Sequence, residues 1–333
     1  MNDELPIKST FKAYDIRGVV GSELTTPIVK KIGQAIGTMA LSQNQKTICV
    51  GYDGRLSSPT LSSTLIDGLL STGIDVVNIG LCTTPMLYFS TFHQATGTGV
   101  MVTGSHNPPE YNGFKIVVNE KTLFSDDIQT LYKAILNSNY LKGKGKERSL
   151  SIKSDYLDEI SNSIKLKRPM RVAIDCGNGA GGVCAEELFK KLGVETEPLF
   201  CDVDGNFPNH HPDPSNPKNL LDLKNVLKNG DSELGLAFDG DADRLGVVTK
   251  DGEIIFPDRQ LLLFSEAVLK ECPQTSIIFD VKSTRYLFSW IRERGGIPVI
   301  WKTGHSFIKQ KMRELNASLA GEMSGHTFFN DRW

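Results

Sequence analysis

The chain has 333 residues, of which 39% are hydrophobic, and its formal net charge is −2. This length and composition allow two or three hydrophobic cores, and the nearly balanced charge argues against nucleic-acid or anionic-membrane binding. No apolar run approaches the roughly 18 residues of a membrane span, and the acidic segment Met1–Leu5 lacks the apolar core of a secretory signal.

Short apolar runs alternate with helical patterns along the chain, which is typical of α/β domains. After the predicted strand Thr47–Gly51, Arg55 could reach a phosphate or pair with Asp53, and we favour a structural role near the cleft. Ser58, followed by proline, predicts a capped helix start. The buried face of this helix would be formed by Leu61, Leu65 and Leu69. Other predicted strands span residues 75–79, 99–102, 171–175, 234–238 and 276–280.

The six cysteines indicate a reducing compartment, because no two of them form a C-x-x-C pair and several interrupt apolar runs. Such residues behave as small apolar core side chains. We therefore expect a cytoplasmic protein with reduced cysteines. Their positions are Cys49, Cys82, Cys176, Cys184, Cys201 and Cys272.

The loop after the predicted strand Gly99–Val102 carries the most informative pattern, TGSHNPP at Thr103–Pro109. Small residues and prolines would present the Ser105 hydroxyl on a stiff turn with little bulk in front of it. Lys115 lies just beyond and would add positive charge. A serine that carries a phosphoryl group needs these parts, although Ser, Asn and Pro also fill ordinary turns.

A polar, glycine-bearing segment at Lys142–Ser149 predicts a linker. Its basic residues lack the aromatic neighbours of a nucleic-acid site. A second domain boundary, with a weaker sequence signal, is predicted near Asp251-Gly252-Glu253. We therefore expect three domains at residues 1–150, 151–253 and 254–333.

Two further patterns in the second domain resemble a dinucleotide-binding site and a metal site. The G-x-G-x-x-G pattern at Gly177–Gly182, with Glu195 and Glu197 beyond it, resembles a dinucleotide-binding fingerprint. A tight strand-to-helix turn explains the same glycines, and we favour it. His210 and His211 are adjacent and would point in different directions, which indicates a rigid proline loop rather than a metal site.

Three carboxylates alternate with small residues after the predicted strand Leu234–Phe238. In an extended segment this spacing places Asp239, Asp241 and Asp243 on one side. Their oxygens would select a hard cation, Mg²⁺ or Ca²⁺. Arg244 could hold a phosphate oxygen.

Two other carboxylate loops fit this segment poorly. An EF-hand requires Gly at the position of Arg244 and Glu at that of Lys250. A haloacid-dehalogenase-like phosphatase, with Asp239 as nucleophile, would have Thr or Val at the position of Asp243, so its match is only partial.

Taken together, the motifs resemble the α-D-phosphohexomutase superfamily, most closely its bacterial phosphomannomutase/phosphoglucomutase branch. The similarity covers nearly all of the chain. Beside the loops of Ser105 and Asp239, it rests on FKAYDIRG at 11–18, DVK at 280–282, KTGH at 302–305 and GEMSGH at 321–326. The resemblance implies consecutive mixed-sheet α/β/α domains and an isomerase of carbohydrate metabolism that acts on small sugar phosphates.

The resemblance also implies a mechanism and its residues. A phosphoserine would interconvert hexose 1-phosphate and hexose 6-phosphate through a hexose 1,6-bisphosphate that turns around between two steps. The implied catalytic residues are Ser105, His106, Lys115, Arg244, Lys282 and His305. The implied substrate-binding residues are Tyr14, Arg17, Lys282, Gly304, His305, Glu322, Ser324 and His326. The implied Mg²⁺ ligands are Ser105, Asp239, Asp241 and Asp243.

Specific roles are expected within this set. Lys115 and Arg244 would neutralise charge, and His106 would either shuttle a proton or orient the loop. His305 and Lys282 are candidates for proton transfer with a sugar hydroxyl. Glu322 and Ser324 alternate along their loop and would face the same sugar edge.

The chain departs from the family at its C-terminal end. Complete relatives have a fourth domain whose R-x-S-N/G-T-E-P loop grips the non-reacting phosphate, and no such motif occurs in this sequence. Because the chain stops at Phe328–Trp333, we expect a truncated protein with an incomplete third domain. The alternative function is an inactive remnant that binds Mg²⁺ and sugar phosphate. The choice between mannose and glucose stays open, as does the oligomeric state, for which a monomer is favoured.

Overall fold

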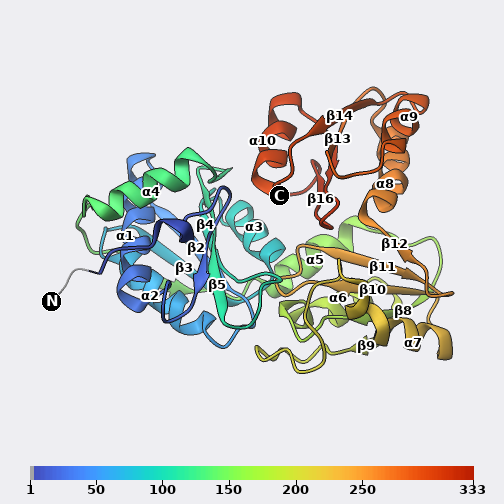
Figure 1. The fold of residues 1–333 in the computed structure, drawn as a ribbon, viewed down its shortest axis with the longest axis horizontal. Helices are drawn as coiled ribbons and strands as arrows, with labels where there is room; N and C mark the ends of the chain where they lie inside the picture. Colours follow the sequence, from blue (N-terminus) through green and yellow to red (C-terminus); the bar gives the residue numbers. More distant parts are fainter. Residues whose placement is uncertain (1–3) are drawn as a thin grey trace.

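The computed structural model describes residues 4–333, which form three α/β/α units, each around its own sheet (Figure 1). In Figure 1 the first unit lies on the left, the second at lower right and the third above the second. This arrangement confirms the predicted fold class of consecutive mixed-sheet domains. No helix within residues 4–333 is long and apolar enough to cross a membrane. Residues 1–3 of the segment predicted not to be a secretory signal lie outside the described part.

The first sheet has the order β1-β5-β4-β2-β3-β7, with β6 paired to β5. Strands β4, β2, β3 and β7 run parallel, whereas β5 is antiparallel to β1, β4 and β6. The strands are β1 (Ile16–Val19), β2 (Thr47–Tyr52), β3 (Asp75–Leu81), β4 (Gly99–Val102), β5 (Tyr111–Val118), β6 (Lys121–Thr122) and β7 (Glu147–Ser149). The helices are η1 (Lys8–Thr10), α1 (Thr26–Ser42), α2 (Ser58–Leu70), α3 (Thr84–His93) and α4 (Asp126–Leu136). Helix α5 (Lys153–Ser163) follows β7, contacts both α3 and α6, and lies beside α6 of the second unit in Figure 1.

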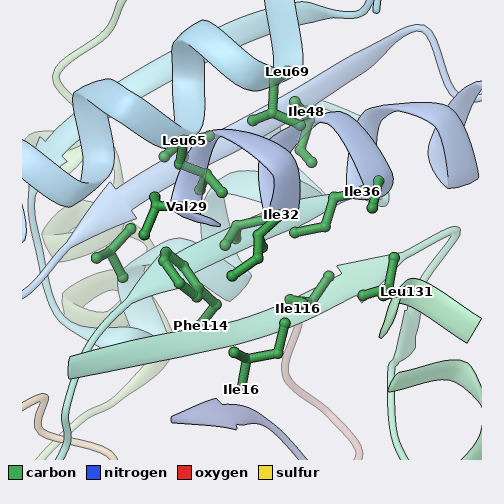
Figure 2. Packing of buried hydrophobic residues seen from close by; sticks show 14 of the residues in the cluster. Ile16, Val29, Ile32, Ile36, Ile48, Leu65, Leu69, Phe114, Ile116 and Leu131 are labelled. Atoms are coloured by element: carbon green, nitrogen blue, oxygen red, sulfur yellow. The ribbon is translucent and has the colours of Figure 1, made fainter. Parts of the chain in front are cut away.

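Successive residues of a strand point to opposite faces, and the first sheet buries both of them. Ile48 and Val50 of β2 join the core under α1, α2 and α4, and Cys49 joins the core under α3 and α5. Figure 2 shows the larger core, where side chains of α1 and α2 meet those of β5 and β1. Burial on both faces explains why these strands appear in the sequence as unbroken apolar runs.

Replacing Leu65 with alanine should lower the free energy of unfolding by about 2–5 kcal/mol, because a cavity would remain in this core. Leu65 is fully buried in the core that also contains Ile32 and Phe114 (Figure 2), whereas Leu56 is 69% exposed. The matched variant Leu56→Ala should leave stability unchanged. Urea denaturation of both variants checks this, and equal effects would contradict the packing described.

The second and third sheets are smaller. Their orders are β12-β11-β10-β8-β9 and β14-β13-β15-β16, each with antiparallel pairs at one end. The second unit contains β8 (Met170–Asp175), η2 (Ala180–Val183), α6 (Ala185–Lys191), β9 (Val194–Leu199), η3 (Pro217–Leu220), α7 (Leu221–Asn229), β10 (Leu234–Phe238), β11 (Leu245–Thr249) and β12 (Ile254–Ile255). The third contains α8 (Pro257–Glu271), β13 (Ser276–Asp280), α9 (Tyr286–Glu293), β14 (Ile297–Trp301), α10 (His305–Leu315), β15 (Leu319–Gly321) and β16 (Thr327–Phe329).

Two details of the sequence analysis were wrong. Ser58 does not cap α2; its hydroxyl donates to Asp53 instead. The end of the predicted linker Lys142–Ser149 forms β7 on the edge of the first sheet. Cys272 is exposed and Cys201 partly exposed, so only the other four cysteines are core residues.

Candidate active site

Most candidate residues lie in loops that leave the carboxyl ends of strands, where open α/β sheets place their ligand sites, whereas Arg17 lies in β1 and Lys115 in β5. Ser105 follows β4, the three aspartates follow β10, and Gly304 follows β14. Glu322 follows β15 directly. The fold therefore brings motifs from three units to one region.

Ser105 is held in an unusual backbone conformation. Its φ of 49° is left-handed, which a residue other than glycine keeps only where its surroundings impose it. The hydroxyl donates to Oδ2 of Asp239 at 2.9 Å and lies 3.1 Å from Nδ1 of His106. The prediction of an open hydroxyl is wrong for this conformation. Ser105 is only 2% exposed, because the side chains of His106 and Asp239 lie against it.

Arg55 organises the serine loop from behind. Its guanidinium donates to the carbonyl oxygens of Pro108, Tyr111, Ser105 and Asn107 at 2.6–3.0 Å. The residue is 1% exposed. This agrees with the predicted structural role of Arg55. The residues that Arg55 holds include the candidate nucleophile, Ser105.

Asp53 completes this support. One carboxylate oxygen accepts from Thr103 Oγ1 at 2.7 Å and from Gly104 N at 3.2 Å, and the same oxygen lies 3.3 Å from Nε of Arg55. A Cβ at Gly104 would lie 2.4 Å from the Arg55 guanidinium. Position 104 therefore requires glycine, because its backbone packs directly against the buried guanidinium of Arg55.

The three aspartates converge through a turn and not through an extended segment, which corrects the predicted reason. Strand β10 ends at Phe238, and Ala242 has a left-handed φ of 57°. Asp239 Oδ1 accepts from the backbone N–H of Asp243 at 3.0 Å and of Arg244 at 3.1 Å. One oxygen from each aspartate lies within 4.8 Å of the others.

Lys115 lies against this cluster. Its ammonium donates to Asp241 Oδ2 at 2.6 Å and also to Asp243, and Thr84 donates to the same oxygen of Asp241. Burial disfavours the charged lysine, but the two carboxylates outweigh it and raise the pKa of Lys115. Burial, then the charges of Asp241 and Asp243, raises the pKa of Asp239 to about 8. The raised pKa shows that the three carboxylates resist carrying their full negative charge together without a further cation.

The turn fits a divalent metal ion. Its three aspartates offer only oxygen ligands, the donor type of hard cations. Oδ1 of Asp241 is buried and has no hydrogen-bond partner among residues 4–333. Such an atom is costly to bury unless something binds it.

Asp241→Asn should weaken divalent-metal binding by at least about 100-fold, because a charged ligand is lost from a buried site. Titration calorimetry with MgCl₂ measures this. The matched control is Asp251→Asn, in an exposed turn, which should bind like the unchanged chain. Equal affinity of the two variants would show that the triad is not the site.

His106 is neutral in this environment. Burial, then the charge of Arg244, lowers its pKa to about 3. Its carbonyl accepts from Nε2 of His211 at 2.5 Å, while His210 contacts Asp175 at 3.0 Å. As expected, the two adjacent histidines point to different partners.

Glu322, Ser324 and His326 form a second cluster. Nδ1 of His326 lies 3.0 Å from Glu322 Oε2 and 3.0 Å from Ser324 Oγ, while Glu322 Oε1 accepts from Gly304 N at 2.5 Å. Glu322 and Ser324 therefore share one side, as predicted. The cause is a turn closed by Gly325 N donating to Glu322 O at 3.0 Å, and not strand-like alternation.

His326 joins this cluster to the metal turn. Its Nε2 lies 3.2 Å from Asp243 Oδ1 and 3.4 Å from Nε of Arg244. Burial alone would lower the pKa of His326, but Asp243 and Glu322 outweigh it and raise the pKa. The third unit thus contacts the loop of the second.

His305 is buried, and its Nε2 has no hydrogen-bond partner within residues 4–333. Burial, then the charge of Lys309, holds its pKa well below the usual value. The ring lies edge-on to Tyr14, with centroids 5.7 Å apart. His305 and His326 both line a cavity of about 860 Å³ between the units.

Two residues that were expected to bind the substrate, Arg17 and Lys282, have other surroundings in the structure. Arg17 donates to the Gly104 carbonyl at 3.0 Å and to Asn107 Oδ1 at 2.7 Å, so it braces the serine loop. Lys282 is exposed beyond the end of β13. The structure brings Arg17 next to Ser105's loop but gives Lys282 no described contact with it.

Sequence reasoning missed two residues of the site. Thr84, at the start of α3, donates to Asp241. Lys309 of α10 lies 3.7 Å from the Tyr88 ring centroid, and burial lowers its pKa to about 7. The T-T-P helix start after β3 was the one signal for Thr84. No local motif distinguished Lys309 as a site residue, since it belongs to an ordinary helical pattern.

These three units, with a serine hydroxyl facing a carboxylate cluster, have the arrangement that an enzyme of the phosphoryl-transfer class requires. Comparison with known families agrees: residues 8–142, 154–252 and 256–333 match "Phosphoglucomutase/phosphomannomutase, alpha/beta/alpha domain" I, II and III, respectively. The chain belongs to this family. It is therefore a hexose phosphate mutase, an isomerase.

Similar proteins support this membership. The chain is 54% identical over 328 residues to a phosphoglucomutase of Neisseria meningitidis, covering 98% of this chain and 71% of the relative. It is 51% identical to a phosphomannomutase/phosphoglucomutase of Pseudomonas aeruginosa, covering 98% and 70%. A solved structure of a phosphoglucomutase/phosphomannomutase family protein from Burkholderia thailandensis has a TM-score of 0.96 at 50% identity, covering 99% of this chain and 74% of that one.

Proposed function

We propose that Ser105 carries the phosphoryl group with which the chain interconverts the 1- and 6-phosphates of glucose or mannose. The observation that carries this is the 2.9 Å contact between Ser105 Oγ and Asp239, inside a turn of three carboxylates. We assign the serine loop to a domain at residues 1–150, the metal loop to 151–253 and the sugar loop to 254–333. The separate sheet of each unit supports this division.

The reaction has two transfers. In the first, the bond between phosphorus and Ser105 Oγ breaks, a bond to the free sugar hydroxyl forms, and that hydroxyl loses its proton. The product is a hexose 1,6-bisphosphate, which turns around within the site. In the second transfer Ser105 takes back the other phosphoryl group, and the sugar oxygen regains a proton.

Residues around Ser105 stabilise the charge that shifts during transfer. Arg244 lies 3.8 Å from Asp239 and Lys115 contacts Asp241, so both cations are within reach of a phosphate on the serine. His106, which is neutral, orients the hydroxyl through its 3.1 Å contact. Mg²⁺ on Asp239, Asp241 and Asp243 with the phosphate of Ser105, when bound, would neutralise the phosphate and favour departure of the serine oxygen.

The sugar binds on the side of the third unit. His305 offers an unpartnered Nε2 to a hydroxyl, and Lys282 and His305 are the candidates for proton transfer. Glu322, Ser324 and His326, already joined by hydrogen bonds, would exchange some of these bonds for sugar hydroxyls. The other expected substrate contacts are Tyr14, Arg17 and Gly304.

Conversion of glucose 1-phosphate and mannose 1-phosphate to their 6-phosphates, with MgCl₂ and catalytic glucose 1,6-bisphosphate, tests this function. We expect turnover that stops when EDTA removes the metal and resumes when MgCl₂ is restored. Phosphate release without isomerisation would instead favour a phosphatase that uses Asp239. The absence of any product would favour an inactive binding protein.

A further inference from the structure

Two cysteines of the second unit lie in contact. Cys176 follows β8 and Cys201 follows β9, and these strands are parallel neighbours in register up to Asp175 and Leu199. The Cys201 thiol donates to the Cys176 sulfur across 3.4 Å. Cys176 is fully buried, and Cys201 is partly exposed. No other two cysteine sulfurs within residues 4–333 share such a contact.

The backbone holds these two sulfurs together. Phe200 has a left-handed φ of 50°, an outlier for a bulky residue. Its carbonyl accepts from Asn178 N at 2.8 Å, and Cys176 N donates to Leu199 O at 3.1 Å. To form a disulfide of about 2.05 Å, the two sulfurs, which lie 3.4 Å apart, would therefore need to approach by about 1.35 Å.

The loops of this thiol pair touch the catalytic loops by two routes. Beyond Cys176, Ala180 N donates to Gly240 O at 2.9 Å, inside the metal turn. A Cβ on Gly240 would lie 2.4 Å from the carbonyl oxygen of Ser105, so these two loops are in close contact. A small shift near Cys176 would therefore be transmitted to the serine.

The second route passes through the proline loop. Asn178 Oδ1 accepts from Asn209 Nδ2 at 2.8 Å. Two residues after Asn209 comes His211, whose Nε2 donates to the carbonyl of His106 at 2.5 Å. Both loops that carry the reacting groups are thus braced by segments adjoining the thiol pair.

We propose that Cys176 and Cys201 form a reversible oxidation site, at which a peroxide makes a disulfide that slows phosphoryl transfer to and from Ser105. The partly exposed Cys201 thiol reduces the peroxide, becoming a sulfenic acid and releasing water. The Cys176 thiol then displaces the hydroxyl from that sulfur, so a disulfide forms and a second water leaves. A dithiol reductant reverses the change. The Cys201 hydrogen bond and burial raise the pKa of Cys176, which fits its place as the second thiol.

The full chain is treated with hydrogen peroxide and its peptides are analysed by mass spectrometry without reduction. We expect a Cys176–Cys201 cross-linked peptide, lighter by two hydrogens, that disappears with dithiothreitol. Cys201→Ser should not form it. Cys272→Ser, which removes an exposed thiol outside the pair, should form it like the unchanged chain. Oxidation of Cys272 in the unchanged chain, without this cross-link, would overturn the proposal.

The effect on the reaction rests on the proposed function and is measured separately. Phosphorylation of Ser105 by glucose 1,6-bisphosphate, followed by intact mass, should slow at least about fivefold after oxidation and recover with dithiothreitol. Cys201→Ser should keep its rate in peroxide. An unchanged rate in fully cross-linked protein would overturn the coupling. A chain that never becomes phosphorylated would instead refute the proposed function, while the peptide analysis still tests the disulfide.

Discussion

Replacing Ser105 with alanine should lower the rate of hexose phosphate interconversion by more than about 1,000-fold, since the group that accepts and returns the phosphate is lost. The fold should be kept, because within residues 4–333 the hydroxyl has hydrogen-bond contacts only with His106 and Asp239. A coupled assay of glucose 6-phosphate formation measures the rate. Metal binding should persist, because the aspartates remain.

Two further variants sharpen this test. Ser105→Gly removes the same hydroxyl but accepts the φ of 49° without strain, so it should fold at least as well and be equally inactive. Ser63→Ala, on an exposed face of α2, should keep full activity. Substantial turnover by either Ser105 variant would contradict the phosphoserine route.

Replacing Arg55 with methionine should destabilise the chain by about 3–5 kcal/mol, because the buried Asp53 would lose its cation. It should also lower activity at least about 100-fold, since the carbonyls of Ser105 and Asn107 lose the donors that fix the loop. Arg55→Lys should recover little, because one ammonium cannot replace a guanidinium that spans four carbonyls. Urea denaturation and the mutase assay check both effects.

The control for charge removal is Arg168→Met, which breaks an exposed pair with Glu233. It should leave stability and activity unchanged. The double variant Arg55→Met with Asp53→Asn removes both buried charges and should recover part of the lost stability, though not the activity. If Arg55→Met were as stable and active as Arg168→Met, the loop would not depend on the buried pair.

Several elements were predictable because local chemistry decides them. Strands such as Gly99–Val102 and Ser276–Asp280 have the predicted bounds, since unbroken apolar runs suit sheets covered on both faces. The face of Leu61, Leu65 and Leu69 is buried as predicted. Helical spacing alone places these side chains on one side.

The remaining features depend on contacts between distant segments. Arg55 and the loop of Ser105 are joined only because β2 and β4 are neighbours in the sheet. Lys115 contacts Asp241 across two units, and His326 contacts Asp243 from the third. The turn of the aspartates is closed by its own backbone N–H groups, a geometry that alternation of residue types does not reveal.

Detection of the phosphate on Ser105 tests the phosphoserine route most directly. The chain is incubated with MgCl₂ and glucose 1,6-bisphosphate, digested, and its phosphopeptides are sequenced by mass spectrometry. After removal of the sugar, glucose 1-phosphate is added. We expect one phosphate on Ser105, which then leaves as glucose 1,6-bisphosphate. A phosphorylated Asp239, or a phosphate on Ser105 that does not transfer to the sugar, would contradict this route.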